Sequence, residues 1–175
     1  RFPLGEIEVE IVAADGIVGN SPIAGANDDN ERSIAVLVTF AGRRLLVTGD
    51  LTGGGESTAD LETPLAAITG PVDVLRTGHH GSKTSSNEAA LSTWSPTIAI
   101  ISAGTDNPYC HPVEEVLMRI AAHAGEVLVT GAGIVDDGDR CGGPTIAPAN
   151  VFLGMGNIEI GITVAGDLFH AAKEL

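Results

Sequence analysis

The chain has 175 residues, 43% of them hydrophobic and 3% aromatic, and this length suits one domain with a substantial core. Nine Lys and Arg residues stand against 23 Asp and Glu residues, so the formal net charge is −14. This balance argues against ordinary nucleic-acid binding, in which Lys and Arg contact backbone phosphates over a broad surface.

A small site for a phosphodiester is still compatible with this charge, because a bound pair of divalent metal ions reverses the field locally. The longest apolar stretches, such as residues 34–40 and 98–101, have the length of strands, and none approaches the roughly 18–20 residues of a membrane-spanning helix. Residues 1–6 lack the features of a signal peptide, and the first residue is not methionine. We therefore expect a soluble piece of a longer chain, with no membrane segment of its own.

The first half of the chain reads mainly as strands. Residues 6–13 alternate polar and apolar side chains, as a half-buried strand does, and residues 15–30 are rich in Gly, Asn, Asp and Pro, as a loop is. Residues 34–40 and 44–47 are rich in Leu and β-branched side chains, and the connection 41–43 has the length of a hairpin turn. The second of these strands ends at Asp50.

Helical and strand patterns then alternate. After a loop at 51–55, residues 56–68 have helical composition interrupted by Pro64, and residues 72–76 read as a short strand. Ser85 and Glu88 form a capping-box pattern, which predicts a helix that ends near 94–96. Residues 97–102 then read as a buried strand.

The clearest helix begins at Pro112 and ends at Gly125. Its apolar face is predicted to consist of Val113, Val116, Leu117, Ile120 and Ala124. A strand is expected at 126–130, a long loop at 131–154 and a final strand at 157–164. Strands alternating with helices, together with hairpins, indicate a layered α/β fold.

Candidate site residues follow the ends of these strands. Asp50 follows one strand, His79 and His80 follow another, and His111 precedes the clearest helix. Imidazole nitrogens with a carboxylate suit zinc or manganese. Each residue also has an ordinary role, since Asp after Gly is a common turn former and His111 could simply enter the helix. Neighbouring side chains in an extended segment point apart, so one of the two adjacent histidines is expected to coordinate a given metal and the other to orient it or face solvent.

Several segments together resemble a known family. They are residues 30–33, 45–50 with Glu56 soon after, 72–85, 100–102 and 107–112, and they include the run His-His-Gly-Ser-Lys-Thr-Ser at 79–85. In order and spacing, over about residues 6–130, they resemble the C-terminal metallo-β-lactamase-like region of ComEC-type competence DNA-uptake proteins. The resemblance implies a layered αββα sandwich of which this chain holds the C-terminal half. It predicts a single domain at 1–175, N-terminally incomplete, with a loop expansion at 132–155.

The resemblance also implies roles for individual residues. Asp50 would be a carboxylate able to bridge two metal ions, and the pair His79 and His80 would supply one late ligand, with a slight preference for His79. His111 would lie at the rim of the active site. The predicted catalytic residues are therefore Asp50, His79 and His111, the metal ligands Asp50, His79 and His80, and the substrate contacts Ser82, Lys83, Asn107 and Tyr109. The implied cofactor is one or two Zn or Mn ions in the complete domain.

The principal metal motif of this fold, His-x-His-x-Asp-His, has no match in the sequence. The chain is therefore expected to be truncated, the alternatives being that a second chain supplies the other ligands or that this relative lost catalysis. A sheet cut in mid-domain exposes an apolar face, which predicts association with the missing half or with a second copy in a homo-oligomer. Cys110 and Cys141 would pair in an oxidising compartment and stay free thiols in cytosol. The sequence leaves the localisation open, with an extracytoplasmic soluble domain of a membrane-associated protein as one option.

The expected function of the intact protein is metal-assisted hydrolysis of a phosphodiester, a nuclease-like activity linked to competence DNA uptake, with DNA or another phosphodiester as substrate. This fragment alone is expected to be inactive. Two alternatives stay open: a catalytically incomplete module that binds or gates a partner, and a hydrolase acting on another ester.

Overall fold

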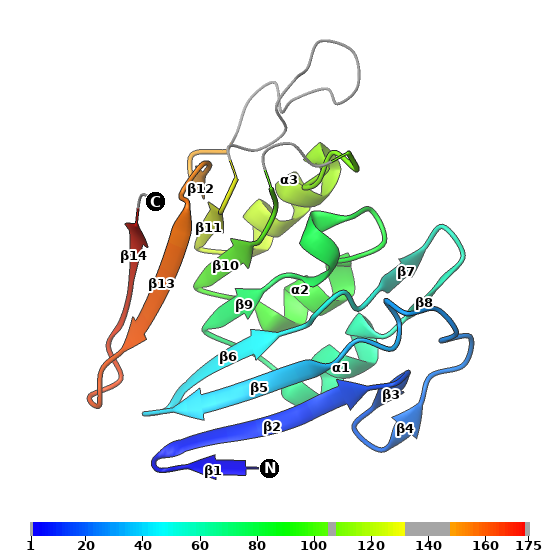
Figure 1. Cartoon of the computed structure of the whole chain (residues 1–175), viewed down its shortest axis with the longest axis horizontal. Helices are drawn as coiled ribbons and strands as arrows, with labels where there is room; N and C mark the ends of the chain where they lie inside the picture. The colour runs from blue at the N-terminus through cyan, green and yellow to red at the C-terminus, as the bar shows by residue number, and fades with distance from the viewer. Residues whose placement is uncertain (1, 105–107, 132–147, 174–175) are drawn as a thin grey trace.

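A computed structural model describes residues 2–104, 108–131 and 148–173. One large mixed sheet dominates this part of the chain, with the strand order β12-β11-β10-β9-β6-β5-β2-β3-β4 and β1 paired to β2 (Figure 1). The strands are β1 Phe2–Leu4, β2 Ile7–Ala14, β3 Ile17–Val18, β4 Ser21–Pro22, β5 Ala35–Phe40, β6 Arg43–Val47, β9 Val74–Arg76, β10 Ile98–Ile101, β11 Glu126–Val129 and β12 Val151–Phe152. The predicted layered α/β class is confirmed.

The hairpin predicted at 34–47 is present, with a shorter turn. Only Ala41 and Gly42 connect β5 to β6, and both have positive φ (48° and 76°), as the twist of two-residue hairpins favours. Arg43 belongs to β6 and pairs with Phe40. From β6 onward the sheet is parallel, because β6, β9, β10, β11 and β12 pair side by side in one direction. Their carboxyl ends therefore meet at one edge.

Helices cover one face of the sheet, namely α1 Glu62–Thr69, α2 Glu88–Trp94 and α3 Glu114–His123 (Figure 1). The predicted apolar face of α3 is confirmed, since Val116, Leu117 and Ile120 are at most 1% exposed. They belong to the main core with Leu46, Leu75, Ala99, Ile101, Val127 and Val129 of the sheet. Trp94 joins α2 to α1 through a bond from its indole nitrogen to Thr69 Oγ1 (3.0 Å).

Two local predictions for residues 56–88 are wrong. The helix expected from 56 starts at Glu62, and a small hairpin of β7 Gly53–Gly55 and β8 Thr58–Asp60 precedes it. Pro64 interrupts nothing, because it lies in the first turn, where backbone N–H groups have no helical partner. Asn87 rather than Ser85 caps α2, with its side chain accepting from Ala90 N.

Among the described residues, a second layer covers the opposite face of the sheet only over its parallel part. A hairpin of β13 Asn157–Ile162 and β14 Leu168–Lys173 lies there (Figure 1). Its side chains Ile158, Ile160 and Leu168 pack on a second core cluster of Val74, Ile98 and Leu128. The strand predicted at 157–164 is confirmed to Ile162, whereas the sequence pattern did not predict β14, β12 or the short strands β1, β3 and β4.

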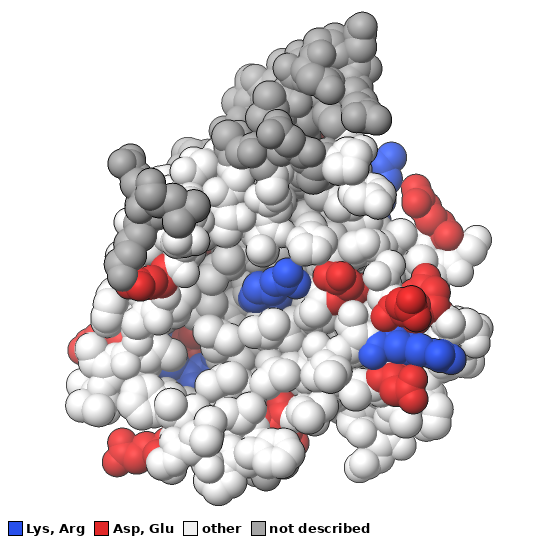
Figure 2. Space-filling view, viewed as in Figure 1, with Lys and Arg blue, Asp and Glu red and all other residues white. Residues whose placement is uncertain are grey.

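The antiparallel part of that face has no covering layer among the described residues. Register places Ile11 opposite Val36, and Val36 opposite Val47. We call the apolar side chains on this side the uncovered face: Phe2, Leu4, Ile7, Val9, Ile11, Val36, Val38 and Val47. Leu4 is 65% exposed and Ile11 49%. Figure 2 shows charged side chains near the centre of this side and gathered at the right, with mostly uncharged surface below the centre.

The predicted expansion at 132–155 falls largely outside the described residues, which resume at Pro148. Cys110 is disulfide-bonded, and Cys141, the other cysteine of the chain, is also outside the described residues. No helix in the described part of the chain is long and apolar enough to cross a membrane.

Candidate functional site

Asp50 lies at the carboxyl edge of the sheet, three residues beyond β6. Its backbone N–H donates to Ser33 Oγ (3.1 Å), and Gly49 before it has φ 60° with Ile34 O and Ser33 Cβ both 3.0 Å from where a Cβ would lie. A glycine is therefore needed for this close turn. The Asp50 carboxylate is half-buried and faces two cationic or titratable groups, Arg76 Nη1 at 3.9 Å and His80 Nε2 at 3.6 Å.

The two adjacent histidines lie in a tight turn after β9 rather than in an extended segment. His79 and His80 both have left-handed φ angles (44° and 55°) within the 3-10 turn Gly78–Gly81. His79 N–H donates to Gly49 O (3.1 Å), which ties the turn to the residue before Asp50. Strained left-handed conformations of non-glycine residues persist only where surrounding bonds hold them, and they concentrate at functional sites.

The two imidazoles have different surroundings. His80 Nδ1 lies 2.5 Å from the carbonyl oxygen of Ser102, which can only accept, so Nδ1 carries the proton. In the neutral ring Nε2 is then a lone-pair donor, and it points toward Asp50. His79 Nδ1 instead contacts Thr84 Oγ1 (3.3 Å), and its ring meets His111 edge-on with centroids 5.8 Å apart.

His111 and Tyr109 lie close to the two histidines, and their role at the rim of an active site stays a prediction. Their rings stack with centroids 5.8 Å apart, and they line a small pocket of about 230 Å³ with His80, Ala103, Gly104 and Pro108. Burial, together with the nearby charges of His79 and His80, lowers the pKa of His111 below its usual value. The segment is held against the histidine turn, since Val113 N donates to Gly81 O and Pro112 fills the space beside Gly81.

The residues predicted to contact substrate differ in how exposed their side chains are. Lys83 is exposed beside the histidine turn, and Tyr109 is 74% exposed. Ser82 is 7% exposed, and its hydroxyl contacts Thr84 Oγ1 (3.3 Å), so its contact lies within the loop. Asn107 lies outside the described residues.

The spacing of Asp50 and His80 matches that of two ligands of one metal ion. Two ligands of one tetrahedral zinc ion, each about 2.0–2.2 Å from it, stand roughly 3.4 Å apart, close to the 3.6 Å separation of Asp50 Oδ1 and His80 Nε2. A carboxylate and an imidazole lone pair facing each other also favour a shared cation, because both are acceptors. No group of three or more His, Cys, Asp or Glu side chains that could hold a metal is found among residues 2–104, 108–131 and 148–173. The pair therefore fits part of a ligand set.

A groove of about 570 Å³ runs beside this pair. Arg76 and Ser102 line it, and these two residues also contact Asp50 and His80. Its other walls are Leu45, Val47, Val74, Ile100, Thr130, Gly156, Asn157 and Ile158. The groove thus runs from the candidate site to the uncovered face of the sheet.

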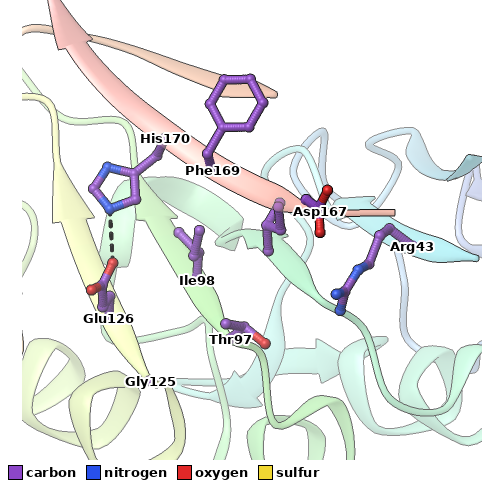
Figure 3. Close-up of a pocket in the computed structure, with 9 residues that line it drawn as sticks. Arg43, Thr97, Ile98, Gly125, Glu126, Asp167, Phe169 and His170 are labelled. Atoms are coloured by element: carbon purple, nitrogen blue, oxygen red, sulfur yellow. Dashed lines mark hydrogen bonds and ion pairs between the residues drawn. The ribbon is translucent and has the colours of Figure 1, made fainter. Parts of the chain in front are cut away.

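The largest pocket, about 620 Å³, lies at the opposite edge of the sheet (Figure 3). There His170 of β14 points across to Glu126 at the start of β11, with Nε2 2.8 Å from Oε2. Arg43 forms an ion pair with Asp73, with Nη1 2.7 Å from Oδ1. Arg43 and Glu126 begin the parallel strands β6 and β11, so the pocket lies away from the strand ends that carry Asp50 and His80.

Glu62 is a residue of the site region that the sequence did not single out. It is fully buried at the start of α1, and its carboxylate accepts the backbone N–H groups of Ser86 and Asn87, both at 2.7 Å. Burial raises the pKa of this carboxyl to about 7. The resemblance pointed to Glu56, which is exposed in the β7–β8 turn. No local pattern in the sequence marks Glu62, because its burial depends on residues 86 and 87, which are distant in the chain.

Residues 7–105, more than half of the chain, match the metallo-beta-lactamase superfamily. Together with the mixed sheet and its helical layer, this match means that the chain belongs to that superfamily.

The chain is similar to bacterial proteins that include a competence protein and a recombination protein. The chain is 42% identical over 105 residues to "Competence protein ComA" of Neisseria gonorrhoeae, 39% over 99 residues to "Recombination protein 2" of Haemophilus influenzae, and 38% over 101 residues to "ComE operon protein 3" of Bacillus subtilis. These matches cover 57–59% of this chain. They span only 14%, 12% and 12% of the respective relatives, so the matched region is a small part of each.

Proposed function

We propose that this chain carries part of the active site of a metal-dependent phosphodiesterase that acts on DNA during competence. The observation that supports this most is the Asp50 and His80 pair, a carboxylate oxygen 3.6 Å from an imidazole nitrogen whose ring is fixed by Ser102. Similarity to competence proteins suggests the setting.

In this proposal Asp50 and His80 would hold a Zn or Mn ion, which when bound would supply Lewis acidity toward the phosphate and lower the pKa of a water molecule. The carbonyl of Ser102 keeps the proton on His80 Nδ1, so that Nε2 stays a ligand. Arg76 holds the Gly49 carbonyl (2.8 Å) and places positive charge beside Asp50. His79 orients the turn through Thr84.

Substrate contacts are assigned to the exposed groups around the pair. Lys83 offers a cation to a phosphate, while Tyr109 and His111 form an aromatic wall on which a base or sugar packs. The net charge of −14 restricts phosphate contacts to this small area, because the remaining surface repels a polyanion. Asn107 belongs to the same predicted rim, and Ser82 is assigned to holding the loop.

The other metal ligands are proposed to come from polypeptide that packs on the uncovered face, either an upstream half of the domain or a second copy of the chain. Ile11 and Leu4 are apolar and about half or more exposed, and the groove beside Arg76 joins this face to Asp50. Burying such a face is favourable by roughly 25 cal/mol per Å² of apolar surface. Association and completion of the site would therefore be one event.

Hydrolysis of DNA and of bis(4-nitrophenyl) phosphate by the full-length protein, with Mn²⁺ or Zn²⁺, tests this function. Asp50→Ala is expected to lower the rate by more than about a hundredfold, beyond the effect of losing an outer partner of a ligand. Asp167→Ala, an exposed carboxylate in the β13–β14 turn, is the matched control. Equal rates for Asp50→Ala and wild type would exclude the proposal.

A second candidate is a module that binds or gates a partner without catalysis. It is favoured by the partial ligand set in the described residues and by the uncovered face. The two candidates differ in one respect: the module predicts association through Ile11 and its neighbours with no metal-dependent hydrolysis by the full-length protein.

A further inference from the structure

The Glu62 carboxylate lies beside Gly78, at the start of the turn that carries the two histidines. An added Cβ on Gly78, the residue before His79, would lie 3.2 Å from Glu62 Oε1 and 2.8 Å from Leu51 O. An added Cβ on Gly53 would lie 2.2 Å from Glu62 Oε2. Two glycines, one on each side, therefore leave the room that this carboxylate occupies.

Both oxygens of the Glu62 carboxylate serve one peptide segment. Oε1 accepts from Ser86 N and Oε2 from Asn87 N, each at 2.7 Å. Arg119 of α3 binds the carbonyl groups of the same segment, with Nε to Ser86 O (2.7 Å) and Nη2 to Ser85 O (3.1 Å). A buried anion and a cation thus hold the N–H and C=O groups of three consecutive residues, which charge-assisted hydrogen bonds do strongly.

This segment is bonded in turn to the histidine turn. The Ser85 hydroxyl donates to Gly78 O (2.9 Å) and to Ser82 O (3.0 Å), and Ser82 N donates to His79 O (2.8 Å). Thr84 contacts His79 Nδ1 through its hydroxyl and accepts from Gly53 N through its carbonyl (2.7 Å). Holding residues 85–87 therefore fixes the left-handed backbone at His79 and His80.

We propose that Glu62 is a positioning residue, which acts through Ser86, Asn87 and Ser85 to hold the His79–His80 turn so that His80 Nε2 faces Asp50. Only the role of His80 as a metal ligand rests on the proposed function. The geometric claim stands on the metal-free chain. A fully buried carboxylate is costly, so its two bonds to the loop backbone and the nearby Arg119 give the physical reason that it is tolerated.

The test uses metal-free ¹⁵N-labelled protein and needs no substrate. Amide hydrogen exchange at Ser86 and Asn87, and the imidazole ¹⁵N signals of His80, are compared in wild type, Glu62→Gln and the control Glu56→Gln. A glutamine keeps one acceptor but turns an NH₂ group toward the other N–H. At least one of the two amides is therefore expected to exchange about tenfold faster, as for one lost hydrogen bond, with a smaller fraction of His80 protonated at Nδ1. The control should match wild type.

The Ile98 amide, bonded to Asp73 O (3.0 Å), reports whether the sheet is folded. Wild-type exchange at Ser86 and Asn87 with an unchanged His80 signal, in a Glu62→Gln protein whose Ile98 stays protected, overturns the proposal. If the Glu62→Gln variant unfolds, the wild-type protein provides the test instead. The amide proton shifts of Ser86 and Asn87 should then titrate together as Glu62 ionises near pH 7. Asp60 and Arg119 are the charged groups that act on Glu62. Flat shifts overturn the proposal. None of these signals depends on hydrolysis, so the result for Glu62 stands even if the protein is not a phosphodiesterase.

Discussion

His80 Nε2 and Asp50 Oδ1 face each other at 3.6 Å, while His80 Nδ1 is bound to the Ser102 carbonyl at 2.5 Å. The histidine is therefore oriented from three strand ends at once, those of β6, β9 and β10. A metal-binding imidazole needs such support, because a hydrogen bond to the ring nitrogen that does not bind the metal fixes both the tautomer and the ring direction.

The space under the histidine turn should tolerate no side chain. Gly78→Ala would bring a Cβ within 2.8 Å of Leu51 O and 3.2 Å of Glu62 Oε1, so we expect a loss of about 1–3 kcal/mol of stability, as overpacking costs. Gly104→Ala is the control, because its Cβ would meet nothing within 4 Å. Urea unfolding of the two variants measures the difference, and equal stabilities would show that the turn can move away at little cost.

Glu62 should make stability depend on pH. Its folded pKa of about 7 lies above the ordinary 4.5, chiefly because burial disfavours the charged form, so the native state binds the proton more tightly than the unfolded state. The contribution to stability therefore falls as pH rises from 4.5 to about 7, by about 3 kcal/mol at 1.36 kcal/mol per pKa unit. Glu62→Gln removes this slope, so the variant should gain on wild type by about that amount over the same range. Chemical denaturation from pH 4.5 to 8 measures it, with Glu56→Gln as control, and parallel curves for Glu62→Gln and wild type would contradict the expectation.

Glu31 should have the opposite pH dependence. This carboxylate is 3% exposed and accepts from the backbone N–H of Ala59, Asp28 and Asn27. These bonds, that of Ala59 first, lower its pKa below 4.5 despite burial. Its stabilisation is therefore present above pH 4.5 and is lost as pH falls through the folded pKa. Glu31→Gln is expected to cost about 2–3 kcal/mol at pH 7, as bonds to a charged acceptor do, and progressively less below pH 4.5. A cost that does not vary with pH would mean that the charge is unimportant.

The uncovered face should drive association. Ile11 is 49% exposed in the middle of this face, whereas Ile68 of α1, 55% exposed, lies on the helical side. We expect the chain to self-associate in sedimentation velocity at rising concentration, and Ile11→Lys to shift it toward monomer more strongly than Ile68→Lys. A compact monomer at all concentrations would count against the proposed role of this face.

Sequence patterns were sufficient where one element decides its own structure. The spacing of Val116, Leu117 and Ile120 predicts the buried face of α3, and the apolar runs predict β5, β6, β9 and β10. The strand ends that carry Asp50, His79 and His80 follow from these runs. The resemblance to ComEC-type proteins predicted the superfamily, which the match over residues 7–105 shows.

Local sequence patterns did not predict structure that depends on contacts with residues far along the chain. The glycine-rich β7 pairs with β8 through tertiary contacts that local propensity does not reveal, and β14 is stabilised by pairing with β13. His123 and His170 look like surface residues in the sequence, yet each is half-buried and bonded to a carboxylate, Glu88 or Glu126. Glu62 is the clearest case, because only the packed structure shows that backbone N–H groups surround its carboxylate.

The most direct test of the Asp50–His80 pair is Mn²⁺ titration of the ¹⁵N-labelled chain, following paramagnetic broadening of each amide. Broadening is expected first around Asp50, His80 and Ala103, and His80→Gln should weaken Mn²⁺ binding by at least about tenfold, more than His79→Gln does. Broadening centred instead on Glu126, Asp167 and His170 at the opposite edge, or unchanged in His80→Gln, would contradict the assignment of a metal ligand to His80.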